Sequence, residues 1–220
     1  TTQAIAFYQS QESDILAKIK LAQVYIKLDL DEAEDWIELA RKQDDQDPRI
    51  HFTRGSIMGQ QAANSIFSAL SYAGKSLDSF EQAVALAPTN IDYQLGLLSF
   101  YVQAPSIAGG DMDKAKQVAQ AITALDPIEG LKANIMVYTA LEDKSGLELL
   151  LQEGLSQHSD DPWFLFNAGM IKQNLQEYAQ AIGLLSQVPL DAENVEYQQR
   201  YFSAQYQIGK TAILAQDFYP

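Results

Sequence analysis

The two histidines are the side chains of this sequence best suited to metal binding or to proton transfer near neutral pH. His51 and His158 lie about a hundred residues apart, and neither has an acidic or histidine neighbour at a ligand spacing such as H-E-x-x-H. We therefore expect both to be surface or rim side chains, with no metal site and no cofactor.

Motifs for other kinds of catalysis are also missing from the sequence. It has no cysteine, which excludes thiol chemistry, disulfides and Cys-ligated metal. It has no G-x-S-x-G nucleophile elbow, no P-loop and no dinucleotide-binding fingerprint. We predict a protein without catalytic residues, which is not an enzyme.

The segment A-P-S-I-A-G-G-D-M-D, residues 104–113, is a candidate anion site. Gly-Gly before a helix can point unpaired amides and the helix dipole at one spot. However, Asp111 and Asp113 would lie where a phosphate has to bind, so we expect them to cap the helix instead. We expect the loop to cross between two helices in a widened turn, with Ile107 tucked into the core.

Acidic residues dominate the charge of the chain. The net charge is -14, from 29 acidic and 15 basic side chains, which argues against nucleic acid or an anionic membrane as a general partner. Residues 29–47 contain nine Asp or Glu among nineteen. Calcium would need oxygens alternating through a Gly-containing loop, whereas this run has a helical pattern, so we predict a solvated helix face. No apolar run approaches the roughly 18 residues of a membrane span.

A spacing of four and then three residues recurs along the chain and predicts the elements that position these side chains. Such steps place side chains on one helical stripe, and small residues in it let a neighbouring helix approach closely. The copies are Ala33, Ile37, Ala40; Ser76, Phe80, Ala83; Ala115, Ala119, Ile122; Leu147, Leu151, Gly154; and Ala181, Leu185, Val188.

Prolines and glycines divide the chain into helical pairs. Prolines follow the copies at positions 48, 88, 127 and 162, at intervals of 40, 39 and 35 residues. Gly55, Gly96 and Gly169 lie in the preceding helices, where a small residue lets the two helices of a pair pack tightly. A period near 34 residues, lengthened by insertions, is typical of an array of helical pairs. In the first pair we expect one helix over residues 3–28 and a second one ending before Pro48.

The segment W-F-L-F-N-A-G-M-I-K-Q-N-L-Q-E-Y-A-Q-A-I-G-L-L, from Trp163 to Leu185, closely resembles the tetratricopeptide repeat family. The resemblance implies an all-α fold, a right-handed solenoid of antiparallel helix pairs with about five pairs plus a terminal helix. It would form a single domain over residues 1–220. The units would span residues 3–48, 49–88, 89–127, 128–162 and 163–189, with the terminal helix at 193–216.

Two insertions depart from the family pattern: about nine residues around 64–71 and about seven in the A-P-S-I-A-G-G loop. Together with Y-Q-I-G-K-T-A at 206–212, they are similar to a group of bacterial repeat proteins that usually carry an export signal. The chain begins Thr-Thr-Gln without an apolar leader, which fits a mature exported protein or a trimmed sequence. We expect a periplasmic or exported protein, with the cytoplasm as the alternative.

The resemblance also implies a concave groove lined by the first helix of each pair. Carrying over the second, fifth, ninth, twelfth and thirteenth positions of each unit gives candidate partner-binding residues that are rich in aromatics, methionine and amides. They are Arg49, Phe52, Gln60, Asn90, Tyr93, Leu97, Phe100, Tyr101, Lys132, Met136, Trp163, Phe166, Met170, Gln173 and Asn174, followed by Tyr201 of the next helix.

Exposed aromatic side chains grouped on one face commonly form a recognition surface. The alternative is that the insertions, or a further C-terminal helix, cover the groove and make these residues core. The sequence therefore favours a non-enzymatic scaffold that binds a protein or peptide. A self-association or assembly module of a cell-envelope complex is the second hypothesis. A small-ligand carrier or enzyme, with its site between the two insertions, is the third.

Overall fold

The computed structural model describes residues 2–11, 13–191 and 193–217, and all the regular elements among them are helical. The chain divides into two compact units, Thr1–Glu142 and Asp143–Pro220. One continuous repeat domain over the whole chain remains a prediction.

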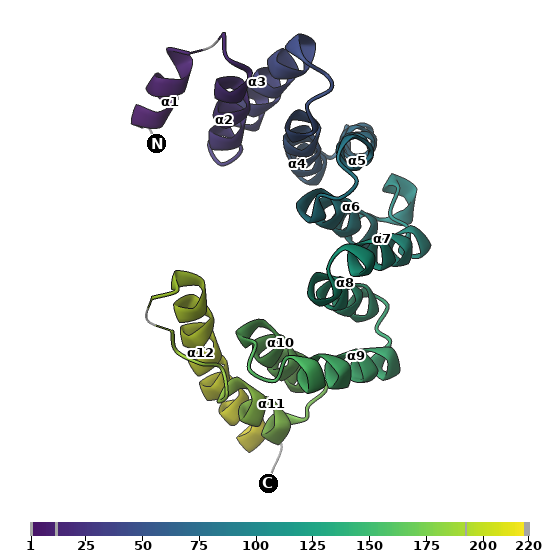
Figure 1. Cartoon of the computed structure of the whole chain (residues 1–220), viewed down its shortest axis with the longest axis vertical. Coiled ribbons are helices and arrows are strands. Elements are labelled where there is room, and N and C mark those ends of the chain that lie inside the picture. The colour runs from purple at the N-terminus through teal and green to yellow at the C-terminus, as the bar shows by residue number, and fades with distance from the viewer. Residues whose placement is uncertain (1, 12, 192, 218–220) are drawn as a thin grey trace. The chain divides into compact units, whose positions relative to one another are not determined.

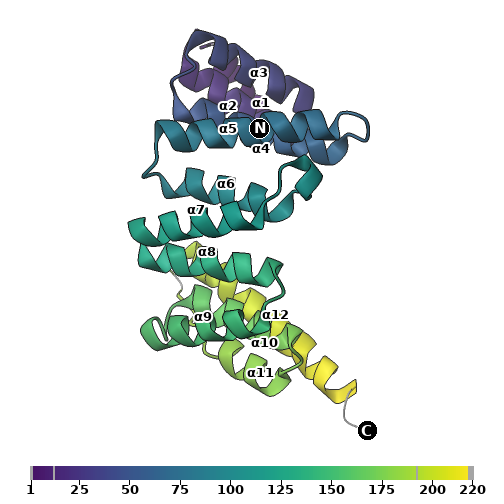
Figure 2. The ribbon, with the colours of Figure 1, turned by 90° about the vertical axis from the view of Figure 1, so that its right-hand side faces the viewer.

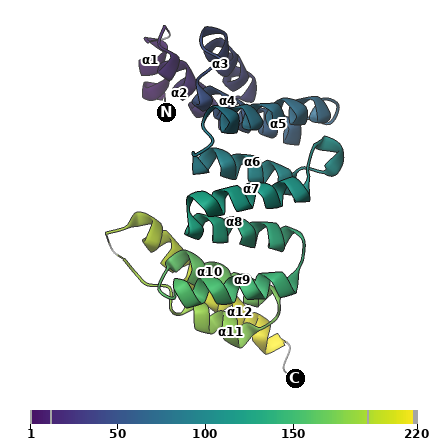
Figure 3. The same ribbon diagram turned by 45° about the vertical axis from the view of Figure 1, so that its right-hand side comes forward.

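Unit 1 consists of helices stacked side by side, in which each helix packs on its neighbours along the chain (Figures 1 and 3). Helix α2 pairs with α3, α4 with α5, and α6 with α7. Its elements are α1 (Thr2–Gln9), α2 (Ile15–Tyr25), α3 (Leu30–Gln43), α4 (Pro48–Asn64), α5 (Ala69–Leu86), α6 (Ile91–Gln103), the short 3-10 helix η1 (Ser106–Ala108), α7 (Met112–Leu125) and α8 (Pro127–Ala140).

Unit 2 contains one further helical pair and a long helix that packs on it. Helices α10 and α11 form the pair, α9 packs on α10, and α12 packs against both members of the pair. The elements are α9 (Lys144–Gln157), α10 (Pro162–Asn174), α11 (Tyr178–Leu185) and α12 (Val195–Asp217).

Three helices begin with an Asp-Pro dipeptide. Asp47, Asp126 and Asp161 are the N-cap residues of α4, α8 and α10, and each side chain accepts a hydrogen bond from a backbone N–H of the first turn. The following proline needs no hydrogen bond in that turn and has a φ suited to a helix. These dipeptides therefore begin the three helices, and Asp126 is at the same time the C-cap residue of α7.

The first helix is shorter than the sequence predicts. One helix over residues 3–28 was expected, but α1 ends at Gln9 and α2 begins at Ile15. The Asp14 side chain accepts the N–H of Leu16 at 3.1 Å, and this cap begins a new helix. The single-helix prediction is wrong because a capping carboxylate competes with helix continuation.

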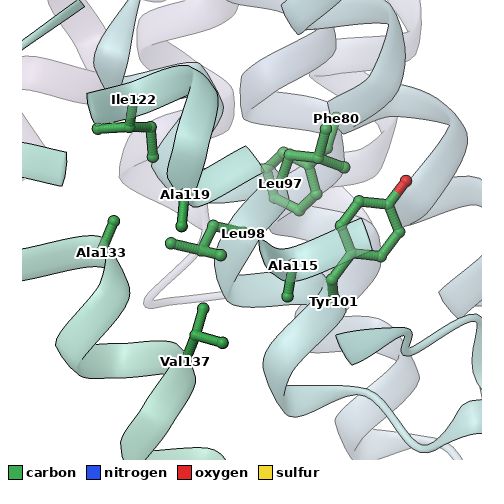
Figure 4. Packing of buried hydrophobic residues seen from close by; sticks show 9 residues of the cluster. All are labelled: Phe80, Leu97, Leu98, Tyr101, Ala115, Ala119, Ile122, Ala133 and Val137. Atoms are coloured by element: carbon green, nitrogen blue, oxygen red, sulfur yellow. The ribbon is translucent and has the colours of Figure 1, made fainter. Parts of the chain in front are cut away.

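The four-then-three spacing correctly identifies the core. Every residue of its five copies is buried. Figure 4 shows part of the core of unit 1, in which Leu98 of α6 lies among Ala119 of α7 and Ala133 and Val137 of α8. Because alanine occupies so many of these positions, the helices approach closely, and little apolar volume is needed between them.

The three pair glycines are also confirmed as positions of close approach. A Cβ atom on Gly55 would lie 2.8 Å from Cδ1 of Phe80, and one on Gly169 would lie 2.6 Å from Cγ of Leu185. Gly96 has Phe52 and Phe80 at similarly short range. A side chain at any of these places would push its neighbour away.

Candidate functional site

The two insertions lie next to one another in unit 1. The first lengthens α4 and α5 and connects them through the turn at residues 65–68. The second forms η1, which packs against α5; in Figure 2 it lies beside α5 and α6. Gly109 has a φ of 100°, a conformation that favours glycine, and a Cβ there would lie 3.0 Å from Cδ2 of Leu77. The loop therefore returns closely onto α5.

The anion-site candidate at the end of this loop is occupied by the protein itself. Asp111 is the N-cap of α7, and its carboxylate accepts the N–H groups of Asp113 and Lys114 at 2.9 and 3.1 Å. Capping by Asp111 is therefore confirmed, whereas Asp113 is an exposed residue of the first turn. The expectation for Ile107 is wrong: its side chain is 80% exposed because η1 turns it away from the core.

A cavity of about 700 Å³ lies between the two insertions. We call it the insertion cavity. Helices α4, α5 and α6 and the loop with η1 contribute its walls. The lining residues are Phe52, Gly55, Ser56, Gly59, Gln60, Ala62, Ala63, Ala69, Leu70, Ala73, Ser76, Phe80, Gly96, Ser99, Phe100, Gln103, Ala104, Pro105, Ile107 and Ala108.

The walls of the insertion cavity are made mainly of glycine, alanine and aromatic rings, without a charged side chain among the lining residues. Two of its hydroxyls already donate hydrogen bonds within the protein, Ser56 to the Phe52 carbonyl at 3.1 Å and Ser76 to the Gly55 carbonyl at 2.7 Å. The cavity therefore offers an apolar environment with few free polar groups.

Large apolar side chains remain in water around the two insertions. Phe67 and Ile66, in the turn between α4 and α5, are 100% and 89% exposed. Leu70 and Ile107, which line the cavity, are also exposed. Grouped exposed apolar residues of this kind commonly indicate a binding surface.

The groove candidates in unit 1 fall into three classes of exposure. Arg49 and Gln60 are exposed; Phe52, Asn90, Phe100, Lys132 and Met136 are half-buried; Tyr93, Leu97 and Tyr101 are buried. Phe52 of α4 and Tyr93 of α6 lie together, with ring centroids 5.0 Å apart. Asn90 is already used as the N-cap of α6, where its Oδ1 accepts the N–H of Tyr93. Phe52, Gln60 and Phe100 also line the insertion cavity.

The expected exposure of Tyr93, Leu97 and Tyr101 is corrected by their burial. Leu97 and Tyr101 belong to the hydrophobic cluster of α5 to α8 (Figure 4). The Tyr101 hydroxyl donates to Oε1 of Glu81 at 2.7 Å. Burial and this hydrogen bond to a carboxylate raise the pKa of Tyr101. Tyr101 is thus largely buried between α5 and α7, where it lines, together with Leu97, a shallow open pocket of about 420 Å³.

In unit 2, four groove candidates follow one another along α10. Trp163, Phe166 and Met170 are half-buried and Asn174 is exposed; we call these four residues the α10 stripe. Gln173 is an exception among the α10 candidates, since it is buried and its Nε2 donates to Oγ1 of Thr211 in α12 at 2.6 Å. Gln173 therefore joins two helices, and its expected exposure is corrected.

Tyr201 of α12 is half-buried and packs, together with Phe166, against the cluster of Leu165, Leu185, Val188 and Ala204. These contacts hold α12 on the α10–α11 pair.

Lys172, which the sequence did not single out, is buried and its Nζ lies 2.6 Å from Glu148 and 2.9 Å from Glu177. Burial opposes its charge, but the two carboxylates outweigh burial and raise the pKa of Lys172.

Both histidines make contacts within the protein. His51 was expected at the surface but is buried, and its Nε2 lies 2.7 Å from the carbonyl oxygen of Asp45. The amphipathic pattern hid this contact because it is made to the loop before α4. His158 is half-buried and stacks on Phe164 with ring centroids 5.3 Å apart. Within the described residues, no three His, Asp or Glu side chains gather in a metal-binding arrangement.

The acidic run forms the helix that the sequence predicts, with Asp29 as the N-cap of α3. Glu38 accepts a hydrogen bond from Nε of Arg54 at 2.6 Å, and this bond joins α3 to α4. Burial alone would raise the pKa of Glu38, but the bonds from Arg54 and Arg41 outweigh it and lower the pKa. Part of this acidic face is therefore used within unit 1.

No helix in the described part of the chain is both long and apolar enough to cross a membrane.

Comparison with known proteins finds similarity in solved structures only. No family model matches the sequence, and the comparison with curated proteins gives no match. A thermophilic TPR protein of Thermus thermophilus, TTC0263, is 16% identical with a TM-score of 0.61, over 91% of this chain and all of its own. PilW, described as a widely conserved type IV pilus biogenesis factor, is 15% identical with a TM-score of 0.58, over 89% of this chain and 92% of its own.

YrrB, described as a TPR protein with an unusual peptide-binding site, is 16% identical with a TM-score of 0.50, over 92% of this chain and 95% of its own. At such identities the similarity establishes the fold. The chain is an all-α protein with the tetratricopeptide-repeat fold, built from antiparallel helix pairs. This confirms the fold class predicted from the sequence.

Proposed function

We propose that this chain is a non-enzymatic scaffold that binds a protein or peptide through the first helices of its pairs. The observation that carries the proposal is the α10 stripe, in which Trp163, Phe166, Met170 and Asn174 follow one another at helical spacing and none of them is fully buried. Aromatic and methionine side chains bury much area on binding, and an amide can hold a peptide backbone.

The tetratricopeptide-repeat fold supports the proposal, because repeat proteins of stacked helices present extended binding surfaces. YrrB, which shares the fold, is described as having a peptide-binding site. Among the other groove candidates that keep some exposure, the proposed contacts in unit 1 are Arg49, Phe52, Gln60, Lys132 and Met136. Because the chain has a net charge of -14, a partner with positive charge would be attracted to it.

A binding assay with substituted protein tests the proposal. Wild-type protein and a Met170→Ala, Asn174→Ala double variant are immobilised, and the proteins captured from a cell extract are compared. The matched control is Gln180→Ala, at an exposed position of α11. We expect the double variant to lose partners that the control retains, with little change in melting temperature. An unchanged set of partners, or a fall of many degrees in melting temperature, would refute this role of α10.

Export to the cell envelope belongs to the same proposal. The fold shared with PilW, described as a pilus biogenesis factor, supports it. Separation of periplasm from cytoplasm in cells that produce the protein from its own gene tests it. Recovery of the protein in the cytoplasmic fraction alone would refute export.

Self-association is the second candidate function, and the outer face of α12 favours it. Phe202, Tyr206 and Ile213 are 63%, 71% and 64% exposed on this helix, and a Cβ on Gly209 would meet no neighbouring atom. A Cβ on Gly55, Gly96 or Gly169 would instead meet a side chain of a neighbouring helix. A helix of a second copy would fit here. Light scattering over a range of concentrations tests this: a monomer at every concentration would remove the candidate.

A further inference from the structure

The insertion cavity is larger than one side chain or one ring requires. An apolar cavity of about 150 Å³ is enough to hold benzene. At about 700 Å³ the insertion cavity lies within the range of roughly 300–1,000 Å³ that is usual for sites of small molecules and cofactors. The cavity is therefore large enough for a whole small molecule, and not only for a single inserted side chain.

The lining selects against charge. Charged residues make up 20% of the sequence, yet none of the cavity's lining residues, all of them in the described part of unit 1, is charged. A carboxylate or phosphate inside would lose its hydration without a cation to replace it, which is strongly unfavourable. The net charge of -14 adds a repulsive potential for any anion outside.

The lining also offers little to a ligand that needs hydrogen bonds. The hydroxyls of Ser56 and Ser76 donate to the carbonyls of Phe52 and Gly55, and the other backbone walls belong largely to helices, whose groups are paired internally. The remaining polar side chains of the lining are Gln60, Ser99 and Gln103. A peptide in extended conformation would find only these three side chains as partners and would leave most of its N–H and C=O groups unpaired. A hydrocarbon chain makes no such demand.

The shape of the walls favours a flexible chain over a rigid ring system. Nine of the twenty lining residues are glycine or alanine. The rings of Phe52, Phe80 and Phe100 lie close to one another, with ring centroids 5.8 Å apart for Phe52 and Phe80 and 6.5 Å apart for Phe80 and Phe100. Exposed Leu70 and Ile107 continue the apolar lining to its edge. A linear alkyl chain can follow such a wall and bury its methylenes along it.

We propose that the insertion cavity binds a long, unbranched alkyl chain carried by a head group without negative charge. The chain lies between α4, α5, α6 and η1, and the head group remains in water. This inference does not rest on the proposed binding role of α10, since the cavity lies in unit 1; of the proposed partner contacts, only Phe52 and Gln60 also line it.

The first test is a chain-length series with neutral head groups. Octyl, decyl and dodecyl maltosides are titrated into the full chain by calorimetry, below the concentrations at which they form micelles. Each buried methylene contributes about 0.8 kcal/mol, so two more of them should raise the affinity about fifteenfold. An affinity that does not change with chain length would overturn the proposal.

Variants locate the binding. Ala63→Trp places an indole at an exposed lining position of α4, and Ser99→Phe places a ring at a lining position of α6. We expect either variant to weaken dodecyl maltoside binding about fifteenfold, the equivalent of roughly two buried methylenes. Ala124→Trp, at an exposed position of α7 outside the cavity, should stay within about twofold of wild type. Equal binding by all three variants, with unchanged melting temperatures, would overturn the assignment to this cavity.

Two further arms distinguish the source of the chain. Dodecanoate tests a free fatty acid, and we expect it to bind more weakly than dodecyl maltoside; tighter binding would overturn the assignment of the head group. Vesicles of a zwitterionic phospholipid test a lipid tail, and their binding should also be lost in Ala63→Trp. Binding of a Leu–Lys amphipathic peptide that depends on Ala63, without binding of any maltoside, would overturn the proposal in favour of a protein partner.

Discussion

A Cβ atom on Gly96 would lie 2.6 Å from Cε2 of Phe52, closer than side-chain carbons approach one another in folded proteins. The two residues belong to α6 and α4, which are the first helices of consecutive pairs. The same Cβ would lie 3.1 Å from Phe80 of α5. Gly96 thus sets how closely three helices approach beside the insertion cavity.

Gly96→Ala should therefore lower the free energy of unfolding, by about 1–3 kcal/mol, because the new methyl overpacks the contact. Gly74→Ala is the matched control: Gly74 is in α5, and its Cβ would meet no neighbouring atom. Alanine there should instead add about 0.5–1 kcal/mol through its better helix propensity. Thermal unfolding of both variants checks the prediction, and a stabilised Gly96→Ala would contradict it.

Asp111 and Asp113 provide a second matched pair. Asp111→Ala removes the cap of α7 and should cost about 0.5–2 kcal/mol. Asp113→Ala removes an exposed carboxylate that makes only a long ion pair with Lys116, at 3.9 Å, and should change the free energy of unfolding by less than about 0.5 kcal/mol. Chemical denaturation of the two variants measures the difference; equal losses would show that the cap is not the source of the stability.

These contacts show which parts of the fold can be read from sequence. Ala119 and its counterparts repeat at fixed steps because each must meet a neighbouring helix, so a pattern along the chain is enough to find them. Gly96 could also be found from the sequence, because glycines recur in the helix that precedes a copy of the spacing. The cap at Asp14 was missed because apolar residues continue at helical spacing on both sides of it.

The insertion cavity could be located from the sequence but not described. The two insertions depart from the repeat, and a site between them is the third hypothesis from the sequence; the structure brings them together. The volume of the cavity, however, depends on how α4, α5 and η1 pack together, and η1 lies far from α4 in the sequence. The small residues Ala62, Ala63, Ala69 and Ala73 were the available signal, since small side chains leave space wherever no neighbouring helix closes on them. The sequence left open whether Tyr101 is exposed or core, because its burial depends on contacts with α5 and α7.

Lys172 carries the third prediction. Its ammonium is buried and lies between Glu148 and Glu177, both of which keep about a third of their side chains exposed. Lys172→Met would leave two carboxylates facing each other and should cost about 1–3 kcal/mol, less than for a fully buried pair because water screens them. Lys116→Met, which removes only an exposed ion pair, should change little. Denaturant titration of both variants at neutral pH makes the comparison, and similar stabilities for the two would contradict the prediction.

The last prediction concerns pH. Burial and the hydrogen bond to Glu81 raise the pKa of Tyr101 in the folded protein above the ordinary value of about 10. Between the ordinary pKa and the raised one, the unfolded chain has released the phenol proton while the folded chain retains it. The unfolded state then binds fewer protons, so the free energy of unfolding falls as pH increases in this window, and the stability from this group is complete below it.

Tyr101→Phe removes the titrating group together with its hydrogen bond. At neutral pH it should cost about 0.5–1.5 kcal/mol. Above pH about 10, where an ordinary phenol titrates, the variant should lose stability with pH less steeply than wild type, so the two curves converge. Tyr206→Phe, at an exposed position of α12, is the control and should keep the wild-type slope. Denaturation measured from neutral to alkaline pH checks this; parallel curves for wild type and Tyr101→Phe would mean that the hydroxyl does not stay protonated in the folded protein.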